Sequence, residues 1–288
     1  MDKLFPRTEV EGVSLSRMII GTNWMAGWSH TSPSADQMIK KFHAGTKSIV
    51  RMLEVFGEAG VDTVMAPFSQ TPVICRAIEE AREKTGKDFI LIDTPIINVE
   101  NSREARKEAE TVIRRGKEIG ACISLIHHSS AEQLVNKGKQ TIERLDDYTA
   151  MIRDADMIPG LSAHMPELVV YSDQNEYDVQ TYIQIYNCLG FMMQVEIETV
   201  NQIIQEAKKP VMTIKSMAAG RCTPFVGLNF SWATIRDCDM VTVGCFNEQE
   251  AREDIEISLA ALEHRRAEIG KRGSPNLKQD AFGKKGPE

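Results

Sequence analysis

The feature that most restricts how this chain can fold is a short run of β-branched and apolar residues that recurs about every 30 residues. Each run is followed by a stretch in which apolar residues have helical spacing. Eight runs occur, at residues 17–21, 61–66, 89–93, 121–127, 157–162, 179–186, 211–215 and 240–244. Such alternation of strands and helices is typical of α/β proteins with a parallel sheet.

Helix starts between the runs support this interpretation. Thr71 followed by Pro72 is an N-cap residue with proline at the first helical position, and Asn247 is placed to cap the last helix. Because an open doubly wound sheet rarely has so regular a count, eight strand–helix units favour a closed (β/α)₈ barrel. We expect residues 1–264 to form this single domain and residues 265–288 to form a basic, flexible tail.

The charge balance excludes several classes of partner. Asp plus Glu number 41 and Lys plus Arg number 34, so the net charge is −7, and we expect no nucleic-acid-binding or anionic-membrane surface. No segment has the roughly 18 uncharged apolar residues of a membrane helix, and residues 1–11 are too charged for a signal peptide. We therefore expect a cytoplasmic protein acting on a small molecule, with homo-oligomerisation left open.

Three of the six histidines follow adjacent runs, at the end where active sites of (β/α)₈ barrels lie. His127 and His128 stand at the end of the fourth run, and His164 follows the fifth. Neighbouring strands bring His127 and His164 within reach of each other, which predicts acid–base catalysis. Asp93, which ends the third run, completes an open three-ligand site for a divalent metal with these two histidines. The alternative is that the histidines are structural.

Lys215 ends the seventh run and faces the predicted barrel mouth. Three roles fit it: a nucleophile or general base of lowered pKa, an anchor for substrate oxygens or a phosphate, and a partner in a structural ion pair. Gly220 and Arg221 in the next loop suit a phosphate site. The residues expected to contact the substrate are Asn23, His128, Gln184 and Arg221.

Six segments at the predicted strand ends follow one another in a distinctive order. They are VSLS continuing into MIIGT, then AGVDT, SLIHH, GLSAH, PVMTIKSMAAGR and VTVGCFNEQEAREDI, and they span most of residues 10–262. Their order and spacing resemble the strand-end segments of the aldo-keto reductases. The resemblance implies the same barrel, with a short N-terminal hairpin that plugs its bottom. It also implies carbonyl reduction with NADPH by an Asp, Tyr, Lys and His set, in which the tyrosine protonates the carbonyl oxygen.

Only part of that catalytic set is present in this sequence. Asp62 in AGVDT matches the aspartate, and His127 in SLIHH matches the histidine. The tyrosine position falls on Pro67 or Phe68, and the lysine position falls on residues 93–94, which are Asp and Thr. This departure makes NADP a less expected cofactor and leaves the cofactor undefined, with a divalent metal as one candidate.

These observations lead to three hypotheses. The first is a non-redox lyase, isomerase or epimerase for a small sugar-like or hydroxy-acid substrate, such as one in carbohydrate metabolism. Its catalytic residues would be His127, His164, Lys215 and Asp62. The second hypothesis is an NAD(P)H-dependent reductase in which Tyr171, Tyr186 or a histidine donates the proton. The third is a non-catalytic protein that binds a small ligand. The sequence favours the first, because the rim histidines and a lysine remain while the tyrosine relay is missing.

Overall fold

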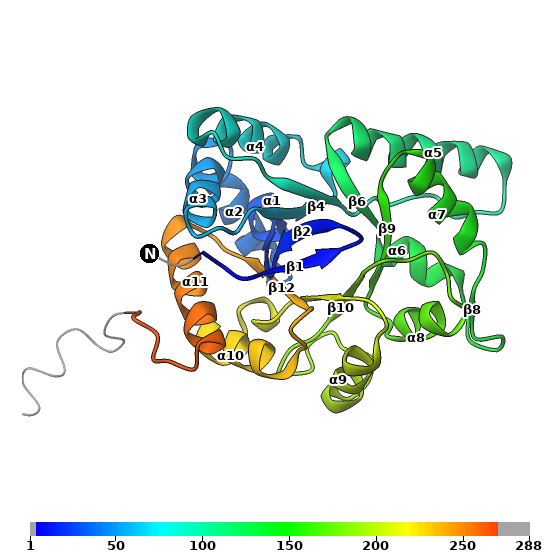
Figure 1. The fold of residues 1–288 in the computed structure, drawn as a ribbon. Coiled ribbons are helices and arrows are strands. Elements are labelled where there is room, and N and C mark those ends of the chain that lie inside the picture. Colours follow the sequence, from blue (N-terminus) through cyan, green and yellow to red (C-terminus); the bar gives the residue numbers. More distant parts are fainter. Residues whose placement is uncertain (1–3, 270–288) are drawn as a thin grey trace, which may run out of the picture.

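The computed structural model describes residues 4–269, in which the eight runs form a closed barrel of parallel strands (Figure 1). In order around the barrel, the strands are β3 (Met18–Gly21), β4 (Thr63–Ala66), β5 (Ile90–Asp93), β6 (Ala121–Ile126), β9 (Ile158–Ala163), β10 (Tyr182–Ile185), β11 (Val211–Ile214) and β12 (Met240–Gly244). Each strand pairs with the next one in this order, and β12 closes on β3. The predicted (β/α)₈ barrel is confirmed.

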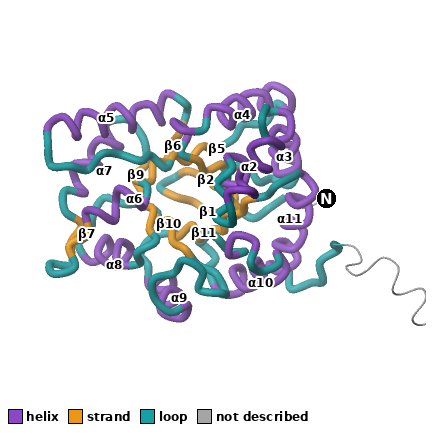
Figure 2. Tube along the Cα trace, turned by 180° about the vertical axis from the view of Figure 1, so that it is seen from behind, coloured by secondary structure: helices purple, strands orange, loops and turns teal. Residues whose placement is uncertain are grey.

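Helices surround the strands (Figure 2). They are α1 (Asn23–Ala26), α2 (Pro33–Phe42), α3 (Lys47–Glu58), α4 (Pro72–Thr85), α5 (Arg103–Glu118), α6 (His128–Ala131), α7 (Leu145–Asp154), α8 (Glu167–Gln174), α9 (Ile197–Glu206), α10 (Pro224–Thr234) and α11 (Glu248–Leu262). The loops also hold three 3₁₀ helices and a small antiparallel pair, which are η1 (Phe68–Gln70), η2 (Glu132–Leu134), η3 (Ala218–Gly220), β7 (Val135–Asn136) and β8 (Thr141–Ile142). The predicted cap of α11 is formed, because the Asn247 side chain accepts hydrogen bonds from the backbone N–H groups of Gln249 and Glu250.

Side chains alternate along each strand between the barrel interior and the surrounding helices. Most interior side chains are apolar and form one buried cluster, which includes Ile19, Met65, Ile92, Ile123, Leu125, Ile158, Ile183, Met212 and Met240. The outward side chains pack against apolar helix faces, such as the face of α3 that carries Ile49, Met52, Leu53 and Phe56. The barrel is therefore a filled core, and a ligand has room only above it.

A β-hairpin closes the amino end of the barrel. Strands β1 (Arg7–Val10) and β2 (Val13–Ser16) pair antiparallel, and both turn residues, Glu11 and Gly12, have positive φ, which suits a two-residue hairpin turn. The side chains of Val10 and Leu15 are buried in the interior cluster, and Figure 1 shows the hairpin lying across the barrel. The N-terminal hairpin that the resemblance implied is confirmed.

Most of the predicted tail lies outside the described residues. Only residues 265–269 of the segment 265–288 are described, and there Arg265 forms an ion pair with Glu256 at 2.6 Å. The flexible tail and the division at residue 264 therefore stay predictions. No helix within residues 4–269 combines the length and the apolar character needed to cross a membrane.

The packing of the hairpin predicts a strong effect of Leu15→Ala, because Leu15 is fully buried beneath the barrel. We expect this substitution to lower the free energy of unfolding by about 2–5 kcal/mol, as measured by urea denaturation. Leu189, which is 53% exposed, provides the control, and Leu189→Ala should change stability by less than about 0.5 kcal/mol. Equal unfolding midpoints for Leu15→Ala and the wild type would contradict a stabilising role for the plug.

Candidate functional site

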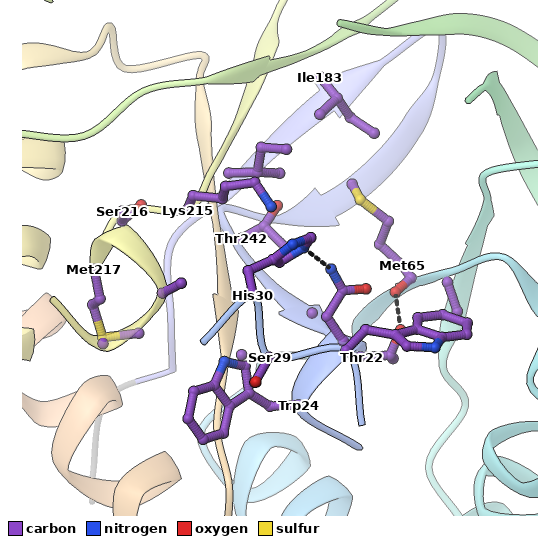
Figure 3. Close-up of a pocket in the computed structure, with 18 of the residues that line it drawn as sticks. Thr22, Trp24, Ser29, His30, Met65, Ile183, Lys215, Ser216, Met217 and Thr242 are labelled. Atoms are coloured by element: carbon purple, nitrogen blue, oxygen red, sulfur yellow. Dashed lines mark hydrogen bonds between the residues drawn. The ribbon is translucent and has the colours of Figure 1, made fainter. Parts of the chain in front are cut away.

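A cavity of about 930 Å³ lies at the carboxyl end of the barrel. It is lined from all eight barrel strands or the loops that follow them, and Figure 3 shows a close-up of its wall. Ile183 and Met65 on the wall also belong to the interior cluster, so the floor of the cavity is the packed barrel core. This is the end of the fold at which (β/α)₈ enzymes carry their active sites.

Three histidines stand together on one side of the cavity. His127 follows β6, His128 opens α6, and His164 follows β9. The rings of His128 and His164 are stacked, with centroids 3.6 Å apart and planes inclined by 15°, and the His127 ring lies 4.2 Å from that of His128. The Nδ1 atom of His127 lies 2.7 Å from the Ser129 hydroxyl oxygen. His127 and His164 thus share one cavity, with His128 between them.

Burial keeps these imidazoles neutral. It lowers the pKa of His127 to about 4 and that of His164 to about 3, and the nearby positive charge of Lys215 acts in the same direction on both. At neutral pH the two rings therefore offer one N–H donor and one lone pair each. The two rings are therefore better suited to bind a substrate oxygen through a hydrogen bond, or to act as a base, than to act as a cationic acid.

Lys215 reaches the cavity through an unusual backbone conformation. Ile214, the last residue of β11, packs with the interior cluster, so simple alternation would turn Lys215 towards the helices. Instead Lys215 has φ of 62°, in the left-handed region, and its side chain lines the cavity (Figure 3). Non-glycine residues held in this region often mark functional sites.

The half-buried Lys215 side chain has no acidic partner within the described part of the chain. None of the ion pairs found among residues 4–269 includes it, which argues against the structural ion pair considered above. Desolvation lowers its pKa to about 8. At neutral pH the group is protonated, yet it gives up its proton more readily than an exposed lysine does.

The loop after β11 offers anion-binding groups. Arg221 lies over the Phe191 ring at 3.9 Å and donates a hydrogen bond to the carbonyl oxygen of Ala218. Gly220 has φ of 82°, and nothing lies within 4 Å of the position that a Cβ would take there. The hydroxyl oxygens of Ser216 and Thr242, both on the cavity wall, are buried and have no hydrogen-bond partner among the described residues. A ligand with several oxygens would satisfy these groups.

Several wall residues were not predicted from the sequence. His30, in the loop after α1, lies 3.5 Å from the Asn23 amide nitrogen, as the dashed line in Figure 3 marks. Glu250, Glu253 and Asp254 bring carboxylates from α11 to the same cavity as Arg221. The loop that carries His30 has no periodic pattern to place it, whereas the acids lie in the helix that Asn247 was predicted to cap.

Three predicted site residues lie elsewhere. Asp62 precedes β4, at the amino end of the barrel, where its carboxylate pairs with Arg7 of the hairpin at 2.8 Å. Its predicted catalytic role is therefore wrong, because the whole strand separates it from the cavity. Asp93 and Gln184 point outwards, since each follows an interior isoleucine, Ile92 or Ile183, by one residue. Neither lines the cavity, so Gln184 cannot contact a substrate there.

Asp93 is enclosed between the barrel and α5. Its carboxylate accepts a hydrogen bond from the backbone N–H of Phe68, and its Oδ2 atom lies where a Cβ on Gly116 would be. This position removes Asp93 from the predicted metal set with His127 and His164. Burial raises the pKa of Asp93 to about 6, so the side chain is a structural carboxyl group that ionises at a cost.

The tyrosines also lie away from the cavity, since none of the five lines it. The Tyr186 hydroxyl group accepts a hydrogen bond from Asn201 and lies 3.0 Å from the Thr234 hydroxyl oxygen, behind the barrel wall. Tyr171 is buried in α8. Neither residue is placed to donate a proton to a substrate.

Comparison with solved structures places the fold among the aldo-keto reductases. A protein from Pseudomonas aeruginosa assigned as an aldo-keto reductase matches with a TM-score of 0.64 at 13% identity, covering 91% of this chain and 99% of that one. An aldo-keto reductase from Klebsiella pneumoniae, solved in complex with NADPH, matches with a TM-score of 0.57 at 14% identity, covering 93% and 92%. A complex of an aldo/keto reductase from the same organism with NADP and acetate scores 0.57 at 13% identity, covering 92% of each chain. No family model and no curated protein sequence matches the chain.

These neighbours correct the leading functional hypothesis. The expected aldo-keto-reductase-like barrel is confirmed as a fold, but the interpretation as a non-redox lyase, isomerase or epimerase is wrong. The solved structures named above are assigned as aldo-keto reductases, and two of them were solved with NADPH or NADP. The second hypothesis, an NAD(P)H-dependent reductase, is favoured instead.

The buried Asp93 predicts a distinctive dependence of stability on pH. Its pKa of about 6 in the folded protein exceeds the ordinary value of 3.8, so between these values the folded state binds more protons than the unfolded state. Stability contributed by Asp93 is therefore full below about pH 4 and is lost as the pH rises through 6. We expect Asp93→Asn to be of the order of 2 kcal/mol more stable, relative to the wild type, at pH 7 than at pH 4.

Urea denaturation at both pH values measures this difference. Asp237, whose side chain is fully exposed, provides the baseline variant Asp237→Asn. If the stability difference between wild type and Asp93→Asn is the same at pH 4 and pH 7, Asp93 does not carry an elevated pKa.

Proposed function

We propose that this chain is a carbonyl reductase dependent on a nicotinamide dinucleotide, in which Lys215 takes the place of a tyrosine as proton donor. The observation that carries the proposal is a protonated lysine of pKa about 8, without an ion-pair partner in residues 4–269, on the wall of a cavity of about 930 Å³ that no tyrosine lines. The fold, shared with reductases solved with NADPH or NADP, supports the choice of reaction.

The residues of the cavity fit a dinucleotide. Its phosphates would be held by Arg221, by the backbone at Gly220 and by the unpaired hydroxyl groups of Ser216 and Thr242. Trp24 and Trp28 follow β3 and line the cavity, where they supply flat apolar surface for the aromatic rings of the dinucleotide. When bound in reduced form, the nicotinamide supplies the hydride, which is the part of the chemistry that no side chain can provide.

The side chains divide the remaining work. Lys215 donates a proton from Nζ to the carbonyl oxygen, and its lowered pKa brings the donor close to the operating pH, where general acids work best. The neutral rings of His127 and His164 orient that oxygen through an N–H group and do not compete for the proton. The apolar floor excludes water, so the field of the ammonium acts on the substrate with little screening.

Replacement of Lys215 tests the proton donor. We expect Lys215→Met to lower kcat by about 10²–10⁴-fold in NADH- or NADPH-dependent reduction of small aldehydes, followed by the loss of absorbance at the nicotinamide band. Lys208→Met, at the amino side of β11 and bonded to Asp173, is the matched control and should leave kcat unchanged. In the wild type, kcat/KM should be level below pH 8 and fall above it, because the donor must be protonated.

The outcomes separate the hypotheses. If Lys215→Met retains wild-type kcat, the proton comes from another group and the assignment to Lys215 fails. Saturable binding of the dinucleotide without turnover of any carbonyl compound would instead favour the non-catalytic ligand-binding protein.

The acids of α11 predict the choice of dinucleotide. Glu250, Glu253 and Asp254 share the cavity with Arg221, and an added 2′-phosphate beside carboxylates is repelled, whereas a ribose hydroxyl group can donate to them. We expect NADH to bind more tightly than NADPH in a titration of nicotinamide fluorescence. Replacing Glu250 and Glu253 together by Gln should lower the ratio of the Kd for NADPH to the Kd for NADH by about tenfold. An unchanged ratio would show that the acids do not face the ribose.

A further inference from the structure

The helix that opens after β6 places two candidate metal ligands on one face. His128 is the first residue of α6, and Glu132 opens η2 four residues later, so both side chains project from the same side of one helical turn. His164 comes from the loop after β9, and strand β9 itself packs against α6. One nitrogen from each histidine and one carboxylate oxygen of Glu132 lie within 4.8 Å of one another, in the one such group found within residues 4–269.

From this geometry we infer that His128, Glu132 and His164 bind a divalent metal ion of the zinc or ferrous class. Two histidines and one carboxylate are the protein ligands of many catalytic zinc sites and of the non-haem iron facial triad. Metal–ligand bonds near 2.1 Å at the angles of tetrahedral or facial sites place ligand atoms about 3.0–3.4 Å apart, so the three side chains must close around an ion by up to about 1.8 Å to bind it. This set differs from Asp93, His127 and His164, which the sequence suggested and the fold separates.

The carboxylate is held ready by the backbone. The Oε1 atom of Glu132 accepts hydrogen bonds from the backbone N–H groups of His164, at 2.7 Å, and Met165, at 2.8 Å. These contacts fix the side chain beside the His164 ring and leave Oε2, for which no donor is found in the described part of the chain, to face a cation. Outer contacts that orient a ligand in this way are a regular part of metal sites.

The site is open on one side. His128 and His164 both line the cavity, so an ion held by them keeps coordination positions directed at the space where a substrate binds. An open position is the mark of a catalytic metal and not of a structural one. Glu132 contributes the negative charge that favours a cation, and Lys215 is the nearby charge that opposes it.

Metal binding would change the arrangement of the rings. His128 and His164 are stacked at 3.6 Å, but the lone pair of an imidazole nitrogen lies in the ring plane. One ring must therefore turn out of the stack when both nitrogens meet a common ion. In a carbonyl reductase the ion would polarise the carbonyl oxygen near Lys215. That role rests on the proposed function, whereas the binding itself does not.

Direct binding measurements on the tag-free full chain test the site. After treatment with a chelator, we expect one Zn²⁺ per chain by calorimetry, and Co²⁺ should give visible d–d bands without the near-ultraviolet charge transfer of a thiolate. That last condition matters because the chain has six free cysteines. Bound Zn²⁺ should shift the ring signals of His128 and His164 in NMR spectra.

Variants separate this site from other binding. Glu132→Gln retains an oxygen for the two backbone N–H groups, so it should fold normally and yet lose affinity for Zn²⁺ by about 100-fold, as should His164→Ala. His264→Gln, beyond the end of α11, is the control and should bind as the wild type does. Unchanged affinity in Glu132→Gln and His164→Ala, thiolate charge transfer with Co²⁺, or no stoichiometric binding would each overturn the inference. Zinc binding in a chain that reduces no carbonyl compound would keep the metal site and reject only the reductase.

Discussion

Alternation of side chains along the barrel strands is the constraint on which the rest of the structure depends. One set of residues fills the interior with isoleucine, leucine and methionine, and the other set anchors the helices. A polar residue at the end of a strand reaches the cavity only if it falls in the interior set or if the backbone turns there. Asp93 and Gln184 belong to the outward set. Lys215 would also belong to it, but its left-handed backbone conformation turns the side chain towards the cavity.

Desolvation governs the chemistry of the cavity. Lys215 forms no ion pair within residues 4–269, and partial burial also lowers the pKa of the histidines beside it, which keeps them neutral. The neutral histidines and the protonated lysine fit together. Protonated imidazoles would repel the Lys215 cation, and a deprotonated Lys215 could not act as the acid. At neutral pH Lys215 therefore carries a proton that it can donate, while the pKa values of the histidines beside it are lowered well below neutrality.

The sequence was sufficient for the strands because their apolar runs are short, separate and regularly spaced. The capped helix at Asn247 and the N-terminal hairpin could also be predicted. The rim was harder. The sequence locates the end of a strand but not the direction of its last side chain, so Asp93 was grouped with His127 and His164 in one predicted metal site. Asp62 was assigned to the site through the resemblance of AGVDT to a family segment, although it stands at the start of the run 61–66, and in the structure it precedes β4.

Glu132 could have been found from the sequence, since it follows His128 by four residues and the segment begins after a predicted strand. No local signal links either residue to His164, which only the pairing of β6 with β9 brings near. His30 depends on a loop of irregular conformation, in which it has φ of 56°. Long-range juxtaposition of this kind is set by the closed barrel and not by residue spacing.

The hairpin and the filled interior give the cavity a floor and no rear exit. Two molecules that occupy it together must use the same entrance, so the one seated deeper has to arrive first and depart last. Where one occupant lies beneath the other, binding and release are therefore ordered, and a tightly held deep occupant would limit the rate of the whole cycle by its departure.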